Sequence, residues 1–137
     1  FVNGGTGHFN ADVIAYSTTI SSDLRLKENI NPLKYGLEAV LKLNPVSFDW
    51  KSDDRGHDIG VIAQEVLKVI PEIVAKHDLI GDKKYEFEKE YPGEHPSRYT
   101  VNYEKLSVIL INSIQEQQLQ IDDLKQRVEE LENGSSK

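Results

Sequence analysis

The chain has 137 residues, 38% of them hydrophobic, which allows one modest core or a smaller core extended by an element that is buried against other copies. The absence of cysteine excludes disulfide bonds, thiolate zinc sites and cysteine nucleophiles. A formal charge of -7 would repel a phosphate backbone, and no apolar run is long enough to span a bilayer, so we expect neither nucleic acid nor a membrane as a partner.

The first fifty residues combine turn signals with short apolar segments. Gly and small polar residues dominate residues 1–19, and an apolar patch at 12–16 favours a strand. The segment 22–30 fits no single period, which is typical of a turn followed by a short helix. Helical spacing over 37–43 and alternation over 46–50 then predict a helix and a half-buried strand, whose Phe and Trp are most simply core residues.

The middle of the chain predicts a strand end, a helix and a loop. An apolar run that begins at Ile59 takes on helical spacing as far as Ile70, and Pro71 is expected to end the helix. Polar residues with Gly and Pro breakers fill 77–97, which predicts an exposed hairpin or loop. The segment 99–101 is interpreted as a returning strand.

A long helix is the clearest predicted element. Residues 103–132 contain neither Gly nor Pro, Asn102 is a plausible N-cap, and Asn133-Gly134 is a plausible stop, which gives a helix of about 45 Å. Apolar residues at alternating steps of three and four predict an a/d seam that pairs with copies of the same chain: Ile114, Ile121, Leu124, Val128 and Leu131. A polar Gln117 in one d position leaves the number of copies open.

The hexapeptide Ser22-Asp23-Leu24-Arg25-Leu26-Lys27 holds a candidate nucleophile and a candidate amine base. A serine hydroxyl attacks an amide only when a base takes its proton, and a lysine can do so only when burial or nearby positive charge keeps its amine neutral. On a helix, Ser22 and Lys27 would lie about 140° apart, and on a strand about 17 Å apart. They can therefore meet only across a turn or between neighbouring chains.

The plain alternative is that Ser22 or Asp23 caps a short helix and that Lys27 is a solvated side chain. Five blocks, taken in order along the chain, distinguish the two interpretations: DVIAYST at 12–18, SDLRLKENI at 22–30, PVSFDW at 45–50, IGVIAQEV at 59–66 and YTVNY at 99–103. Together they closely resemble the C-terminal intramolecular chaperone domain of phage tailspikes and tail fibres. That family includes endosialidase tailspikes and the self-cleaving region of myelin regulatory factor.

The resemblance implies a homotrimer that helps an upstream fibre of the same polypeptide to fold and then cuts itself free. Carried onto this chain, the scissile bond lies between Ser21 and Ser22, Ser22 is the nucleophile and Lys27 is the base. Direct attack on the preceding carbonyl and an N-to-O acyl shift followed by hydrolysis both remain open. Asp23 and Arg25 are expected either to order the turn or to stabilise the oxyanion, with a surface ion pair as the plain alternative.

Other polar residues are candidates for assisting the Ser/Lys pair or for binding a metal. His57 could lie near the Ser/Lys pair, and Glu65 could organise it through Arg25 or Lys27, although a solvated helix charge is the simpler interpretation of Glu65. The four histidines show no i, i+3 or i, i+4 pairing, so we expect no metal site and no cofactor.

The expected fold is a small mixed α+β domain of short strands and helices, followed by a long C-terminal helix in a trimeric coiled coil. Residues 1–21 would end an upstream fibre, 22–102 would form the globular part and 103–132 the helix of an auto-processing domain that spans 22–137. The resemblance places the protein in the host bacterial cytoplasm during phage assembly, with the upstream fibre ending in the virion tail. A non-cleaving trimerisation tip that contacts a host receptor is the alternative function.

Overall fold

The computed structural model describes residues 21–51 and 54–135, which fall into two compact units, one that ends at Pro32 and one that begins at Leu33. The strand predicted at 12–16 lies outside the described residues. Within residues 21–32, the described part of the first unit, the regular element is a 3-10 turn, η1, at Leu24–Leu26. The turn expected after Ser22 is therefore present, and it occupies only three residues.

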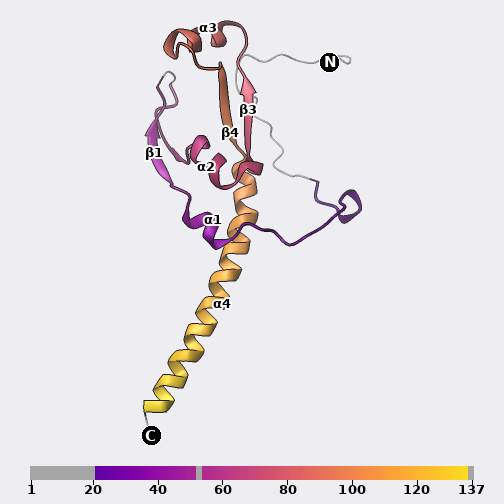
Figure 1. Cartoon of the computed structure of the whole chain (residues 1–137), viewed down its shortest axis with the longest axis vertical. Coiled ribbons are helices and arrows are strands. Elements are labelled where there is room, and N and C mark those ends of the chain that lie inside the picture. The colour runs from indigo at the N-terminus through magenta and orange to yellow at the C-terminus, as the bar shows by residue number, and fades with distance from the viewer. Residues whose placement is uncertain (1–20, 52–53, 136–137) are drawn as a thin grey trace. The chain divides into compact units, whose positions relative to one another are not determined.

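The second unit combines short helices and strands with one long helix, which confirms the predicted α+β class (Figure 1). Its elements in chain order are α1 (Leu37–Leu41), β1 (Val46–Asp49), β2 (His57–Gly60), α2 (Ala63–Val69), η2 (Pro71–Ile73), β3 (Val74–Asp78), α3 (Gly81–Glu90), β4 (Ser97–Val101) and α4 (Tyr103–Ser135).

The strands form two separate antiparallel pairs. β1 pairs with β2, and β3 pairs with β4, in a register that places Asp49 opposite His57 and Asp78 opposite Ser97. Two-stranded sheets are marginal by themselves, and the β3–β4 pair gains support by packing against α2. Gly60 is required at the end of β2 because a side chain there would meet the Tyr103 hydroxyl, which accepts a hydrogen bond from the Val61 amide at 3.0 Å.

The hydrophobic core is small and lies where α1, α2 and η2 meet the first turns of α4. Its most buried members are Val66 and Ile70 from the α2 region, which are 1% and 0% exposed. Ile109 joins this core from α4 at 3% exposure, so the long helix is anchored to the second unit by its first half. The remaining buried apolar residues are Ala39 and Ile73.

The predicted long helix is confirmed as α4, which runs on well past the core-packed turns (Figure 1). Asn102 begins it as expected, since its side-chain oxygen accepts the Lys105 amide at 3.3 Å. The expected stop at Asn133-Gly134 was slightly early, because the helix continues to Ser135. No helix in residues 21–51 and 54–135 is long and apolar enough to cross a membrane.

Two local predictions were wrong. The loop expected over 77–97 contains α3, because the Gly and Pro breakers lie at its ends and the residues between them are mostly Lys, Glu and aromatic. Trp50 is not a core residue, since it is 37% exposed. A two-stranded sheet offers no second layer over its ring, which is instead covered by the Arg55 guanidinium at 3.7 Å.

Candidate functional site

The 3-10 turn at Leu24–Leu26 is built from local hydrogen bonds. The Leu26 amide donates to the Asp23 carbonyl at 3.0 Å, and the Lys27 amide donates to the Leu24 carbonyl at 3.1 Å. Asp23 caps the turn, because its carboxylate accepts the Arg25 amide at 2.8 Å. After the turn, Lys27 returns to extended backbone with φ of -120°.

This turn brings the two residues of the predicted dyad together. The Lys27 Nζ lies 2.6 Å from the Ser22 Oγ and donates a hydrogen bond to it. Neither a regular helix nor a strand could bridge five residues in this way, so one 3-10 turn between extended flanks provides the geometry. Ser21, whose carbonyl would be attacked, directly precedes Ser22 and is exposed.

Asp23 and Arg25 form a second contact inside the same hexapeptide. The Arg25 Nε and Nη2 donate to the two Asp23 carboxylate oxygens at 3.0 and 2.7 Å. The hydrogen bond from the Arg25 side chain, and next the one from its amide, lower the pKa of Asp23. The same side-chain hydrogen bond raises the pKa of Arg25. Both groups are therefore charged at neutral pH, and their partners lie within two residues.

Every residue of the hexapeptide is exposed. Leu24 and Leu26, the apolar residues of the turn, are 71% and 74% exposed, and the turn contributes no buried residue. A lysine that acts as a base needs an environment that disfavours its charge, as burial does. The described chain thus holds the contact between Ser22 and Lys27 in a setting that is open to water.

The two expected helpers have other surroundings in the second unit. The His57 Nδ1 lies 2.8 Å from the Asp49 Oδ1, on the opposite strand of the first sheet. Glu65 lies exposed in the first turn of α2, where a carboxylate is favourable at a helix N-terminus. Among the described residues, no three His, Asp or Glu side chains are grouped so that they could hold a metal ion.

Two residues of α4 that sequence reasoning did not single out hold the segment just after the first unit. Asn112 donates to the Tyr35 carbonyl at 2.8 Å and to the Leu33 carbonyl at 3.3 Å. Glu116 accepts the Leu37 amide at 2.9 Å and so caps α1. The available signal was the presence of polar residues on the side of an amphipathic helix opposite to its seam.

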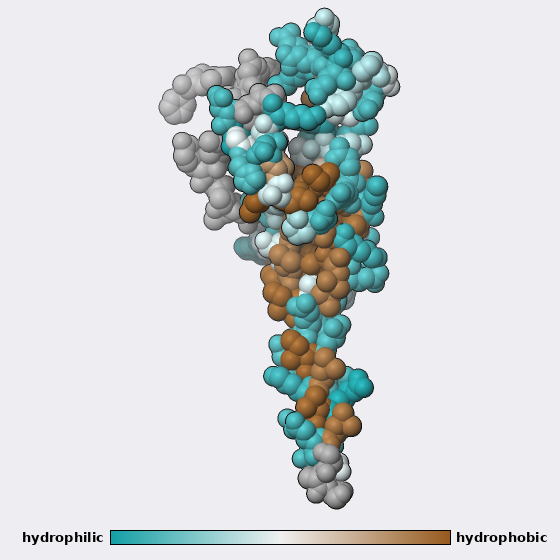
Figure 2. Space-filling model, turned by 90° about the vertical axis from the view of Figure 1, so that its left-hand side faces the viewer, coloured by the Kyte–Doolittle hydropathy of each residue, from teal (hydrophilic) through white to brown (hydrophobic). Residues whose placement is uncertain are grey.

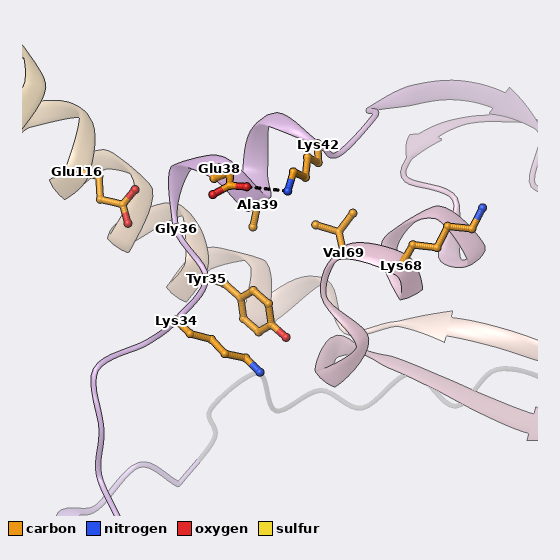
Figure 3. A pocket seen from close by; sticks show the side chains of 9 residues that line it. All are labelled: Lys34, Tyr35, Gly36, Glu38, Ala39, Lys42, Lys68, Val69 and Glu116. Atoms are coloured by element: carbon orange, nitrogen blue, oxygen red, sulfur yellow. Dashed lines mark hydrogen bonds and ion pairs between the residues drawn. The ribbon is translucent and has the colours of Figure 1, made fainter.

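A cavity of about 360 Å³ lies beside this capped segment (Figure 3). Tyr35, Ala39 and Val69 form its apolar wall, and charged side chains surround it. Two of its lysines are already paired, since Lys34 lies 3.0 Å from Glu72 and Lys42 lies 2.8 Å from Glu38. These paired side chains and the Glu116 cap lie where α1 and α2 pack near α4, so we assign them to holding these helices together.

The seam predicted on α4 is an exposed apolar stripe (Figure 2). All five of its apolar members are between 44% and 73% exposed: Ile114, Ile121, Leu124, Val128 and Leu131. Leu110, one helical step of four before Ile114, is 46% exposed and extends the stripe toward the core-packed turns. The space around Ile121, Leu124 and Val128 forms a hollow of about 380 Å³ on the helix surface.

Comparison with known proteins matches residues 22–75 to the peptidase S74 family, described as "Chaperone of endosialidase". The long tail fiber protein Gp37 of Enterobacteria phage M1 is 33% identical over 131 residues, covering 91% of this chain and 44% of that protein. Gp37 of Enterobacteria phage K3 is 35% identical over 85 residues, covering 54% of this chain and 7% of that protein.

The chain therefore spans less than half the length of these curated relatives. The matched family segment begins at Ser22, the first residue of the hexapeptide, and ends in β3. The resemblance inferred from the sequence blocks is confirmed, because residues 22–75 match the family described as "Chaperone of endosialidase" and the chain is similar to phage tail fibre proteins.

Proposed function

We propose that this chain is an intramolecular chaperone that assembles as a homotrimer, assists the folding of an upstream phage tail fibre and then cuts itself free between Ser21 and Ser22. The observation that carries the proposal is the 2.6 Å contact between the Ser22 Oγ and the Lys27 Nζ, within the segment that matches the endosialidase chaperones. The tail fibre relatives support a fibre as the client.

The chemistry is a single hydrolysis within one chain. Neutral Lys27 accepts the hydroxyl proton of Ser22, and the Oγ forms a bond to the Ser21 carbonyl carbon. The bond from that carbon to the Ser22 nitrogen breaks, and the nitrogen takes up the proton from Lys27. Water then hydrolyses the ester, which leaves a carboxylate on Ser21 and a free Ser22 amine. This route is the N-to-O shift, and direct hydrolysis of the same peptide bond would give the same two chain ends without the ester.

Exposure of the hexapeptide supports a link between cleavage and assembly. In the described chain Lys27 donates to Ser22, whereas a base must accept from it, and both residues are open to water. Excluding water would favour the neutral amine that the reaction needs. We propose that association with other copies supplies this exclusion, so that monomers hold the contact without cutting.

The exposed stripe on α4 supports a coiled coil as the means of assembly. Its residues alternate by three and four and are exposed in the single chain, as the a/d residues of a coiled coil are before the helices associate. The trimeric state is the part of this proposal that the family resemblance supplies. Assembly would occur in the host bacterial cytoplasm, and the released fibre would end in the virion tail.

The test uses a longer chain that includes the upstream fibre. The parent should give two fragments on a denaturing gel, the smaller one beginning at Ser22, whereas Ser22→Ala and Lys27→Ala should each give one intact chain. Ser21→Ala is the matched control, because it removes the neighbouring exposed hydroxyl and should still be cut. Cleavage that persists in Ser22→Ala would contradict the mechanism.

One intact species from the parent would instead support a trimerisation tip that stays attached to its fibre. A mass spectrum of the freshly made long chain distinguishes the two outcomes. Light scattering on the same sample should report a trimer in either case, and a monomer at micromolar concentration would contradict both functions.

A further inference from the structure

The closed pair of Asp23 and Arg25 lies between the two residues of the proposed dyad. Three hydrogen bonds join them: the Arg25 amide and Nε to the Asp23 Oδ1 at 2.8 and 3.0 Å, and the Arg25 Nη2 to the Asp23 Oδ2 at 2.7 Å. The carboxylate therefore binds both the backbone and the fork of the same arginine. Such bidentate contacts fix the relative orientation of the two side chains.

The turn that carries the dyad has little else to hold it. It contains no buried residue, so side-chain packing within the described chain does not restrain it. Its backbone contacts are the two short-range hydrogen bonds to the carbonyls of Asp23 and Leu24. If the turn opened to an extended strand, Ser22 and Lys27 would separate to about 17 Å.

We propose that Asp23 and Arg25 are positioning residues whose closed pair holds the 3-10 turn in the form that brings Lys27 to Ser22. This inference rests on the proposed self-cleavage. The Arg25 side-chain hydrogen bonds described above both go to Asp23, so we assign Arg25 to the turn rather than to the oxyanion at the Ser21 carbonyl. Asp23 contributes twice, as the cap of the turn and as the partner of Arg25.

The first variant is the double change Asp23→Ala and Arg25→Ala, which leaves the net charge of the hexapeptide unchanged. The cleavage rate is measured in the full fibre chain by pulse-labelling during cell-free synthesis. We expect it to fall about 10- to 100-fold, because small losses of reacting geometry have effects of that size. The trimer mass and the fragment boundaries should stay the same. A parental rate would overturn the proposal.

Conservative variants separate positioning from a general effect on folding. Asp23→Asn keeps an oxygen that can cap the turn and should recover part of the rate lost in Asp23→Ala. Arg25→Lys keeps the positive charge but not the fork, and should behave like Arg25→Ala. Full activity in Arg25→Lys would overturn the bidentate role and indicate that charge alone is sufficient.

The two single alanine variants complete a double-mutant cycle. Because Asp23 is both the cap and the partner of Arg25, Asp23→Ala should slow cleavage nearly as much as the double change, and Arg25→Ala, which keeps the capped amide, should slow it less. Independent, multiplicative effects would overturn the proposal. Lys42→Ala is the matched control, since it removes an exposed ion pair of 2.8 Å outside the hexapeptide and should leave the rate unchanged.

The outcomes also distinguish this inference from the proposed function. If the Ser22→Ala variant is still cleaved, both the proposed function and the positioning role are wrong. If Ser22→Ala is not cleaved and the Asp23/Arg25 double variant is cleaved at the parental rate, only the positioning role is wrong. If the double variant fails to assemble, the comparison of Asp23→Asn with Asp23→Ala decides, and equal rates in those two would overturn the role of the cap.

Discussion

The two halves of α4 differ in how their apolar side chains are covered. In the first half, Ile109 and Ser113 are 3% and 4% exposed against the core. In the second half, Leu124 and Leu131 are 54% and 73% exposed. The backbone is helical throughout, so the halves differ in their side chains and in what covers them. The first half packs one face on the core and leaves residues such as Leu110 exposed, whereas the described residues of the second half bury no apolar side chain. An exposed apolar stripe of this kind is typical of an interaction surface.

The largest expected effect comes from placing charge on the second half. Ile121→Asp combined with Leu124→Asp should abolish assembly at micromolar concentration, because carboxylates would be buried without partners in the seam. Light scattering should report a monomer, and cleavage of the long chain should stop with it. Leu119→Asp is the control, since Leu119 is 71% exposed but lies off the seam. Cutting by the monomer would separate cleavage from assembly.

The next prediction concerns the contribution of the first half of α4 to the stability of a single chain. In the monomer made by the two seam changes, Ile109→Ala should lower the free energy of unfolding by about 2–5 kcal/mol, because it opens a cavity in the core. Leu131→Ala in the second half, where Leu131 is 73% exposed in the single chain, should change it by less than about 0.5 kcal/mol. Urea denaturation measures both. Equal losses would show that the halves do not differ in the monomer.

A smaller effect is expected where Glu116 of α4 caps the start of α1. A methyl group at Gly36 would collide with the Glu116 carboxylate that caps α1. Gly36→Ala should therefore cost about 0.5–2 kcal/mol of unfolding free energy, the usual value of an N-cap. Gly134→Ala meets no atom within 4 Å and should cause no loss. If Gly36→Ala leaves the free energy of unfolding unchanged, Glu116 caps α1 from another rotamer.

The smallest effect concerns pH. Hydrogen bonds from Lys34 and then Tyr35 lower the pKa of Glu72 below 4.5, so its contribution to stability is present above that value and is lost as pH falls through the lowered pKa. The stability gap between the parent and Glu72→Gln should thus close in acid. Thermal unfolding between about pH 3 and pH 7 measures it. A stability difference that stays constant with pH would show that it does not come from ionisation of the Glu72 carboxyl.

Periodic patterns in the sequence predicted the elements that depend on local signals. The cap at Asn102, the long run without Gly or Pro and the seam together located α4 to within a few residues at its C-terminal end. The same reasoning failed for α3, because Gly and Pro residues at the two ends of a segment do not prevent a helix between them. It also failed for Trp50, since alternation indicates a face but not whether a second layer covers it.

The candidate site was predictable as a list of residues and only partly as a geometry. Spacing restricted Ser22 and Lys27 to a turn or to an interface, and the structure contains a turn that joins them. The closure of Arg25 on Asp23 could not be read from spacing, because an arginine two residues away can equally point outward. The contacts from Asn112 and Glu116 needed tertiary structure, since they join residues 77 to 79 positions apart.

The Ser22 to Lys27 contact spans only five residues, and this affects the timing of any cut. Closing a loop even twice as long takes about 10–100 ns, whereas docking of subunits takes milliseconds to minutes. The contact can thus form on the nascent chain almost as soon as its residues are made, long before a fibre has folded. Under the proposed mechanism, the delay that protects an unfinished fibre must come from the slow, concentration-dependent meeting of α4 helices, so cleavage should be slower in dilute chains.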